Sequence, residues 1–302
     1  MQSQKESRAF LQKLLQSPIS LPFEPTLLPT LFTITRENSN APMGQLVDLI
    51  EHSQKLATRV LAIANSASYG LSYKVSTLHH AVSILGVREI RLLAVLVGMA
   101  SIIQEVKLPK DFDIITLWKH QLKTAAIARA LATELGGPSG LCGPSAKEED
   151  RLGMAPDEAY AAGLLHDIGK ILFAAASPDT WEAVEASWDK EGQQYFEAEN
   201  AYWGLDHALI GAEMLHHWKL PLLLTDPINW HHAPELASTY KMGARLLAAA
   251  NIIAHDTHNG EHGLCERAVA LLPKGVDAFA LELSVIQSLA NADSDSLAAL
   301  IK

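Results

Sequence analysis

The chain has 302 residues, of which 48% are hydrophobic and 19% are charged, and its formal net charge at pH 7 is −10. This balance is typical of a folded protein with a sizeable core, and it excludes a disordered tail and a broadly basic nucleic-acid-binding surface. Two cysteines, neither in a CxxC pair, and a polar N-terminus argue against a disulfide framework, a thiolate metal site and a secretory signal, so a cytoplasmic location is expected.

The first half of the chain is predicted to be helical, because apolar residues recur at a helical period and no alternating run indicates a strand. Gly70 is expected to cap one helix in the left-handed region, and Gly86 to stop another. The apolar run over residues 92–103 is too short to span a bilayer, so it fits a buried helix and no membrane partner is expected. The predicted helices cover residues 7–16, 30–37, 43–51, 54–67, 77–85 and 87–105.

The second half is predicted to continue in the same way after a long helix over residues 113–135 and a polar surface loop over 136–156. Pro156 and the acids after it are typical of a helix N-terminus, and one continuous helix is expected from there through Leu172. Further helices are expected over residues 181–187, 193–203, 207–218, 222–231, 236–255 and 276–302. The predicted fold is all-α, with a smaller N-terminal lobe (1–109), a multi-helix bundle (110–260) and a helical tail (261–302) that packs on the body.

The motif that indicates chemistry is His166-Asp167-Ile168-Gly169-Lys170. In a helix His166 and Asp167 lie about 100° apart around the axis, so both can edge one pocket, and Lys170 can reach it from the next turn. Gly169 is expected to leave the approach clear. An imidazole beside a carboxylate suits Zn, Fe or Mn, and a lysine suits a phosphate. The alternative is a helix that merely contains these residues, but a carboxylate in an apolar helix is costly to bury unless it is paired or metal-bound.

Other histidines fall on different predicted helices. His207 shares a helical face with apolar residues and is expected to point inward. His120 lies on a helix with an apolar inner face, and His231 and His232 lie at a helix end. One inward histidine is usually a core residue, but several beside a His-Asp pair favour a shared metal. For His255, His258 and His262, solvated loop residues are favoured over a second, weaker metal site.

Four segments of the first half form one pattern: Leu27-Leu28-Pro29-Thr30-Leu31, Leu49-Ile50, residues 56–67 with Ala64-Asn65-Ser66, and Ala81-Val82-Ser83-Ile84-Leu85-Gly86. This pattern resembles the HDOD (HD-related output domain) family. The resemblance covers roughly residues 20–255 and departs from the family at His52-Ser53, where Asp-Pro is usual. It implies an HD-domain-like bundle after the N-terminal lobe, and a role in signal transduction.

The second half resembles the HD superfamily of metal-dependent phosphohydrolases, which implies one or two divalent ions (Fe, Mn, Zn or Mg). The resemblance gives catalytic roles to Asp167, which would bridge the ions, and to Lys170, which would contact phosphate. Asn251 stands where the superfamily has a final Asp, and the Gly-Tyr-Pro motif of the related cyclic-dinucleotide hydrolases is missing. The implied metal ligands are His120, His166, Asp167, His207, His231, His232 and Asn251.

Three functions stay open on the sequence. The first is a regulatory HDOD module with a retained metal site, which binds a signalling protein or a small phosphorylated ligand. The missing Asp and Gly-Tyr-Pro favour it. The second is an active metal-dependent phosphohydrolase that acts on a nucleotide or another phosphoester, favoured by the retained His-Asp pair and Lys170. The third is a helical scaffold in which the histidines are incidental.

Overall fold

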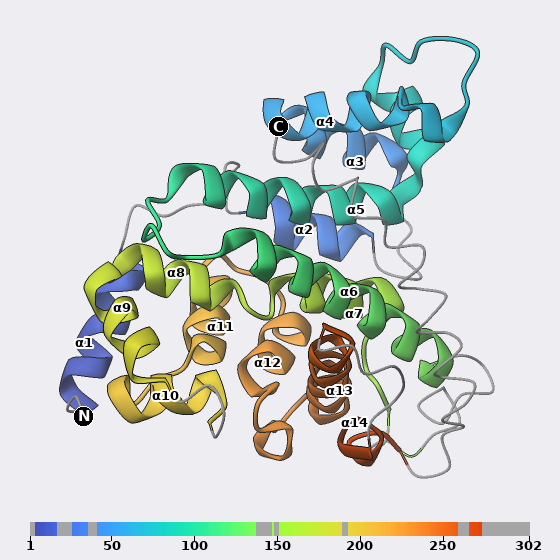
Figure 1. Ribbon diagram of the computed structural model, residues 1–302. Helices are drawn as coiled ribbons and strands as arrows, with labels where there is room; N and C mark the ends of the chain where they lie inside the picture. Colours follow the sequence, from blue (N-terminus) through green and yellow to red (C-terminus); the bar gives the residue numbers. More distant parts are fainter. Residues whose placement is uncertain are drawn as a thin grey trace. The chain divides into compact units, whose positions relative to one another are not determined.

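The computed structural model describes residues 4–16, 26–35, 41–136, 147, 151–188, 193–258 and 266–273. Within these ranges the chain is helical and contains no strand, which confirms the all-α prediction (Figure 1). None of the helices in this described part is long and apolar enough to cross a membrane. The chain divides into two compact units.

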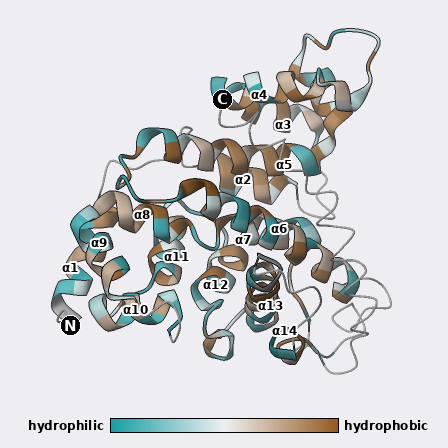
Figure 2. Cartoon of the chain, viewed as in Figure 1, coloured by the Kyte–Doolittle hydropathy of each residue, from teal (hydrophilic) through white to brown (hydrophobic). Residues whose placement is uncertain are grey.

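The smaller unit contains the described residues from 26 to 106 and residues 218–221. Three short helices pack around one long helix, α5, and α2 contacts both α3 and α5. Most of α2 is apolar and appears brown in Figure 2, and its leucines and Phe32 are buried. The helices are α2 (Leu27–Ile34), α3 (Met43–Glu51), α4 (Gln54–Ala64), the 3-10 turn η1 (Ala67–Tyr69) and α5 (Leu78–Glu105).

Two glycines end or interrupt helical structure in this unit as the sequence predicts. Gly70 has a φ of 56° and caps η1, and Gly86 has a φ of 77° and a ψ of 164° within α5. The start of α2 was predicted wrongly, because the helix begins at Leu27 and includes Pro29. A proline is tolerated in the first turn of a helix, where its missing N–H would have no partner within the helix.

The larger unit contains α1 (Gln4–Leu15) and the described residues from 107 onward, apart from 218–221. In it α6 packs against α7 and α13, and α11 packs against α8 and α12 (Figure 1). Phe10 of α1 lies against Trp203, with ring centroids 4.4 Å apart. The other elements are α6 (Ile114–Gly136), α7 (Pro156–Leu165), α8 (Ile168–Ala176), α9 (Pro178–Ser187), α10 (Tyr195–Trp203), α11 (His207–His217), α12 (Leu222–Trp230), η3 (Pro234–Leu236), α13 (Lys241–His258) and α14 (Glu266–Ala270).

Two glycines allow the helices of the larger unit to approach closely. A Cβ on Gly163 of α7 would lie 2.5 Å from Ala125 Cα of α6, and a Cβ on Gly169 of α8 would lie 1.9 Å from the His207 oxygen of α11. Neither position has room for a side chain. The two contacts bring α6 and α11 close to the segment that joins α7 to α8.

The prediction of one continuous helix from Pro156 through Leu172 is wrong. Helix α7 ends at Leu165, and α8 begins at Ile168. Between them Asp167 has φ −102° and ψ 11°, outside the helical region. The break redirects the chain, so that α7 packs on α6 while α8 packs on α11.

The last long helix also differs from its prediction. It begins at Lys241 and not near residue 236, because Pro234–Leu236 form a separate 3-10 turn and the Tyr240 N–H donates to the Asp226 carboxylate at 2.8 Å. The predicted tail helix over 276–302 lies outside the described residues, as does most of the predicted loop over 136–156.

Candidate metal centre

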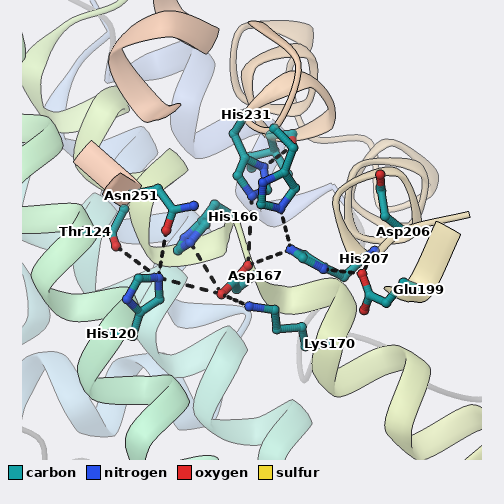
Figure 3. Close-up of polar contacts among 12 residues, drawn as sticks. His120, Thr124, His166, Asp167, Lys170, Glu199, Asp206, His207, His231 and Asn251 are labelled. Atoms are coloured by element: carbon teal, nitrogen blue, oxygen red, sulfur yellow. Dashed lines mark hydrogen bonds and ion pairs between the residues drawn. The ribbon is translucent and has the colours of Figure 1, made fainter. Parts of the chain in front are cut away.

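The Asp167 carboxylate lies at the centre of the histidines predicted from the sequence (Figure 3). Its Oδ2 is 3.5 Å from His166 Nε2 and 3.8 Å from His120 Nε2. Its Oδ1 is 3.0 Å from His207 Nε2 and 4.0 Å from His231 Nε2. The residue is 1% exposed. Each carboxylate oxygen therefore faces a different pair of imidazoles.

Two groups of side chains in this region are able to hold a metal ion. The ligand atoms in each group lie within 4.8 Å of one another. The first group, called the His120 group below, contains His120, His166 and Asp167, and the second, called the His207 group, contains His207, His231 and His232. They come from α6, from the break between α7 and α8, from the start of α11 and from the end of α12. Residues far apart in the chain thus meet around one carboxylate.

Hydrogen bonds to backbone carbonyls fix the protonation of two buried imidazoles. His166 Nδ1 is 2.8 Å from the Gly163 oxygen, and His231 Nδ1 is 2.7 Å from the Ile228 oxygen. Because a carbonyl only accepts, each Nδ1 carries the hydrogen and each Nε2 presents a lone pair. Both Nε2 atoms are buried and have no hydrogen-bond partner. A buried acceptor without a partner is costly, and a cation between these atoms would remove that cost. The residues fit a divalent metal.

Asn251 approaches the pocket from α13. Its Oδ1 lies 2.9 Å from His120 Nε2, and Thr124 Oγ1 lies 3.5 Å from the same atom. The Asn251 amide oxygen thus lies beside His120, which is another member of the predicted ligand set. His255, one turn further along α13, is exposed and has its ring centroid 4.2 Å from that of His120. The side chains of His258 and His262 lie outside the described part of the chain.

We expect Asn251→Asp to tighten metal binding by about tenfold or more, which corresponds to about 1.4 kcal/mol. The aspartate oxygen would carry a negative charge at the place where Asn251 has a neutral oxygen 2.9 Å from His120 Nε2. Competition with a fluorescent chelator measures the dissociation constant. Asn251→Ala, which removes the oxygen altogether, should shift the affinity in the opposite direction. Equal affinities for the asparagine and aspartate forms would contradict this prediction.

Lys170 reaches the pocket, as its spacing predicts. Its Nζ donates to Asp167 Oδ2 at 2.7 Å and lies 5.8 Å from the Tyr195 ring centroid. The side chain of Lys170 is 19% exposed. The ammonium therefore compensates the buried carboxylate while part of the side chain stays accessible to solvent.

Burial and neighbouring charges set the protonation of the site. Burial, which opposes a charged imidazole, lowers the pKa of four histidines below the ordinary value. Burial alone would lower the pKa of His207 too, but the Glu199 and Asp167 carboxylates raise it to about 9. Burial alone would raise the pKa of Asp167, but His166, Lys170 and His207 hold it well below the ordinary value. The four histidines with a lowered pKa are His120, His166, His231 and His232.

Metal affinity should therefore rise with pH. An imidazolium cannot ligate a metal, so an ion must displace the proton that His207 holds up to a pKa of about 9. Each unit of pH between 7 and 8.5 should lower the apparent dissociation constant of an ion bound to His207 by roughly tenfold. Titration calorimetry at pH 7 in buffers of different ionisation enthalpy should show about one proton released for that ion. An affinity that does not change over this range would contradict the expectation.

Glu199 is a buried acid of the candidate site that was not predicted from the sequence. Its Oε2 lies 2.5 Å from His207 Nδ1 and accepts from the His207 backbone N–H at 3.0 Å, and Glu199 is 2% exposed. A signal in the sequence could have identified it. Glu199 is the one acid with an aromatic residue three and four positions away on both sides, which predicts a carboxylate on an apolar helix face. These aromatic residues are Tyr195, Phe196, Tyr202 and Trp203.

Comparisons with known proteins agree with this fold. A family model described as HDOD domain matches residues 21–234. An uncharacterized protein of Treponema pallidum (strain Nichols) is 26% identical over 231 residues, which are 76% of this chain and 41% of that protein. This chain thus spans less than half the length of the curated relative it matches.

Solved structures with the same fold include three bacterial proteins. A candidate phosphohydrolase of Shewanella amazonensis SB2B has a TM-score of 0.70 and 24% identity, covering 97% of this chain and 98% of that one. A candidate signal-transduction protein of Marinobacter aquaeolei VT8 has a TM-score of 0.73 and 22% identity, and the match covers 98% of this chain and 66% of that one. An HDOD domain protein of Geobacter sulfurreducens has a TM-score of 0.64 and 21% identity, and the match covers 99% of this chain and 97% of that one. At these identities the structures bear on the fold alone. With the family match over most of its length, this chain belongs to the HDOD family.

Proposed function

We propose that this HDOD protein is a signal-transduction module that holds one or two divalent metal ions around Asp167 and binds a signalling protein or a small phosphorylated ligand. One observation supports the metal site above all others. His166 Nε2 and His231 Nε2 are buried lone pairs without a partner, and both lie within 4.0 Å of the Asp167 carboxylate. In a helical scaffold that binds no metal, burying these two nitrogen atoms without a hydrogen-bond partner would only destabilise the fold.

The ligands of such ions would be the His120 group and the His207 group, with Asp167 shared between them and Asn251 beside the first. A nitrogen-rich set with one carboxylate suits Zn, Fe or Mn better than Mg. A bound divalent ion supplies polarisation of a phosphoryl oxygen. Lys170 adds a positive charge at the accessible edge of the site, where a phosphate can accept hydrogen bonds from its ammonium.

Metal analysis of the purified full chain tests this function. We expect one or two divalent ions per chain, and a rise in the thermal unfolding temperature when metal is returned to chelator-treated protein. His166→Ala and His231→Ala should lower the metal content, while His216→Ala, which alters an exposed histidine on α11, should not. A protein that takes up no metal under any of these conditions would disprove the proposal. Calorimetric titration of the metal-loaded protein with nucleoside monophosphates then tests ligand binding.

A second candidate function is hydrolysis of a phosphoester. The observation that favours it is the orientation of Asp167, whose Oδ1 and Oδ2 face different histidine groups. Asp167 would be able to offer one oxygen to each of two ions, and a pair of ions would stabilise the attacking and leaving oxygens of a phosphoester displacement. Asn251 argues against turnover, because it removes one negative charge from the set. A panel of phosphoesters with added Mn or Fe distinguishes the candidates. Turnover by the native chain that Asp167→Asn abolishes would establish a hydrolase.

A further inference from the structure

The two metal positions differ in the charges that surround them. We propose that Glu199 is a positioning residue that makes the His207 group the first position to take up an ion, and that the His120 group is filled second. This inference rests on the metal site proposed above. It assigns an order and an additional residue to that site.

Glu199 contacts His207 at both its ring and its backbone. One carboxylate oxygen accepts from both the ring Nδ1 and the backbone N–H of His207, at 2.5 and 3.0 Å. The ring is thereby held at two points, and its Nε2 is directed toward Asp167 Oδ1 and His232 Nε2, at 3.0 and 2.9 Å. A carboxylate behind a ligating histidine orients the ring and makes it a stronger donor. The buried negative charge of Glu199 also attracts a divalent ion.

The fold holds this contact in place through the corner between α10 and α11. Gly204 ends α10 in the left-handed region with a φ of 70°. Asn200 Nδ2 donates to Asp206 Oδ2 at 2.8 Å, and Asp206 Oδ1 accepts from the Leu209 N–H at 3.0 Å in the first turn of α11. These bonds set the register of Glu199 against His207 from within the protein. The His207 ring is therefore oriented before an ion arrives, and the charge of Glu199 then stabilises the ion that displaces the ring proton.

Lys170 pairs with the Asp167 oxygen that belongs to the His120 group. Its ammonium donates to Asp167 Oδ2 at 2.7 Å, and Oδ2 is the oxygen that faces His120 and His166. An ion in the His120 group must approach this positive charge closely. Oδ1, which faces His207, makes no ion pair with a lysine or arginine among the described residues. The Lys170 charge also acts on His207, but the oxygen that the ammonium occupies is Oδ2, so an ion in the His120 group must compete with it and this group is the less favourable first position.

His120 has less buried and less negatively charged surroundings than His207. Its side chain is 12% exposed, and its Nε2 faces the neutral oxygen of Asn251 at 2.9 Å. Within the described part of the chain, Asp167 is the one carboxylate that pairs with His120 or His166. The His207 group has Asp167 and also Glu199. An ion in the His120 group is therefore compensated by fewer negative charges.

Stepwise metal titration of the chelator-treated full chain tests the proposal. With Co²⁺ followed by calorimetry and by its visible absorption, the native chain should bind two ions in distinct steps. Glu199→Gln, which keeps the shape and removes the charge, should weaken the first step by about 10- to 100-fold and change the second by less than about threefold. Glu197→Gln is the matched control, because Glu197 is exposed on the same helix and should leave both steps unchanged.

The outcomes separate this inference from the function it rests on. An unchanged first step in Glu199→Gln, or equal weakening of both steps, would overturn the role of Glu199. A native chain that binds no metal would instead refute the proposed metal site. Should Glu199→Gln not fold, anomalous scattering from native crystals given one equivalent of Zn²⁺ decides the order. A peak between His207, His231 and His232 supports it, and a peak between His120 and His166 overturns it.

Discussion

Asp167→Asn should weaken the binding of every metal ion at this site by on the order of 100-fold or more. The two carboxylate oxygens face different histidine groups, so one substitution removes a negatively charged ligand from both. An asparagine offers one neutral oxygen, and its NH2 group would point a donor at the other position. It would also leave the charges of Lys170 and His207 without the carboxylate that compensates them. Metal content by mass spectrometry and dissociation constants by chelator competition measure the effect.

The control for this variant is Asp179→Asn, which changes an exposed aspartate in the first turn of α9 and should keep native metal content. Circular dichroism shows whether each variant retains its helices. Native metal content in a folded Asp167→Asn protein would mean that the carboxylate is not a ligand. The proposed site would then have to be abandoned.

Gly169→Ala should destabilise the protein by at least about 3 kcal/mol. A Cβ at this position would lie 1.9 Å from the His207 oxygen and 2.8 Å from the Gly211 nitrogen. Both are backbone atoms and cannot rotate away, so α8 and α11 would have to separate. Because this shift also moves His207, metal affinity should fall together with stability. Urea unfolding followed by circular dichroism measures the loss.

Gly136→Ala provides the comparison in the same unit, because its Cβ would meet only the Leu152 side chain at 3.8 Å, an ordinary contact. Its effect should stay within about 1 kcal/mol. Equal stabilities for Gly169→Ala and Gly136→Ala would show that the two helices do not pack as closely as described. The sequence had suggested that Gly169 keeps the approach to the pocket clear. The structure shows that it permits the contact between α8 and α11.

Much of the local structure could be predicted because it depends on residues close together in the chain. Helical periodicity located most helices, and the stops at Gly70 and Gly86 were predicted from the conformational freedom of glycine. The His-Asp pair and several histidines on other predicted helices were identified in the sequence, and the resemblance to the HD superfamily joined them into one ligand set. Helical periodicity could not predict the break at Asp167, because the packing of α8 on α11 redirects the chain there.

The geometry of the site was decided by tertiary structure. Periodicity shows which face of a helix is apolar, but it does not show which other helix will cover that face. Only packing brings His120 and His207 to opposite oxygens of Asp167, and only packing places Glu199 behind His207. The sequence alone therefore determined the all-α class, the residue types of the site and the loss of one acid at Asn251. The distances, the protonation states and the difference between the two metal positions depend on contacts between residues far apart in the chain.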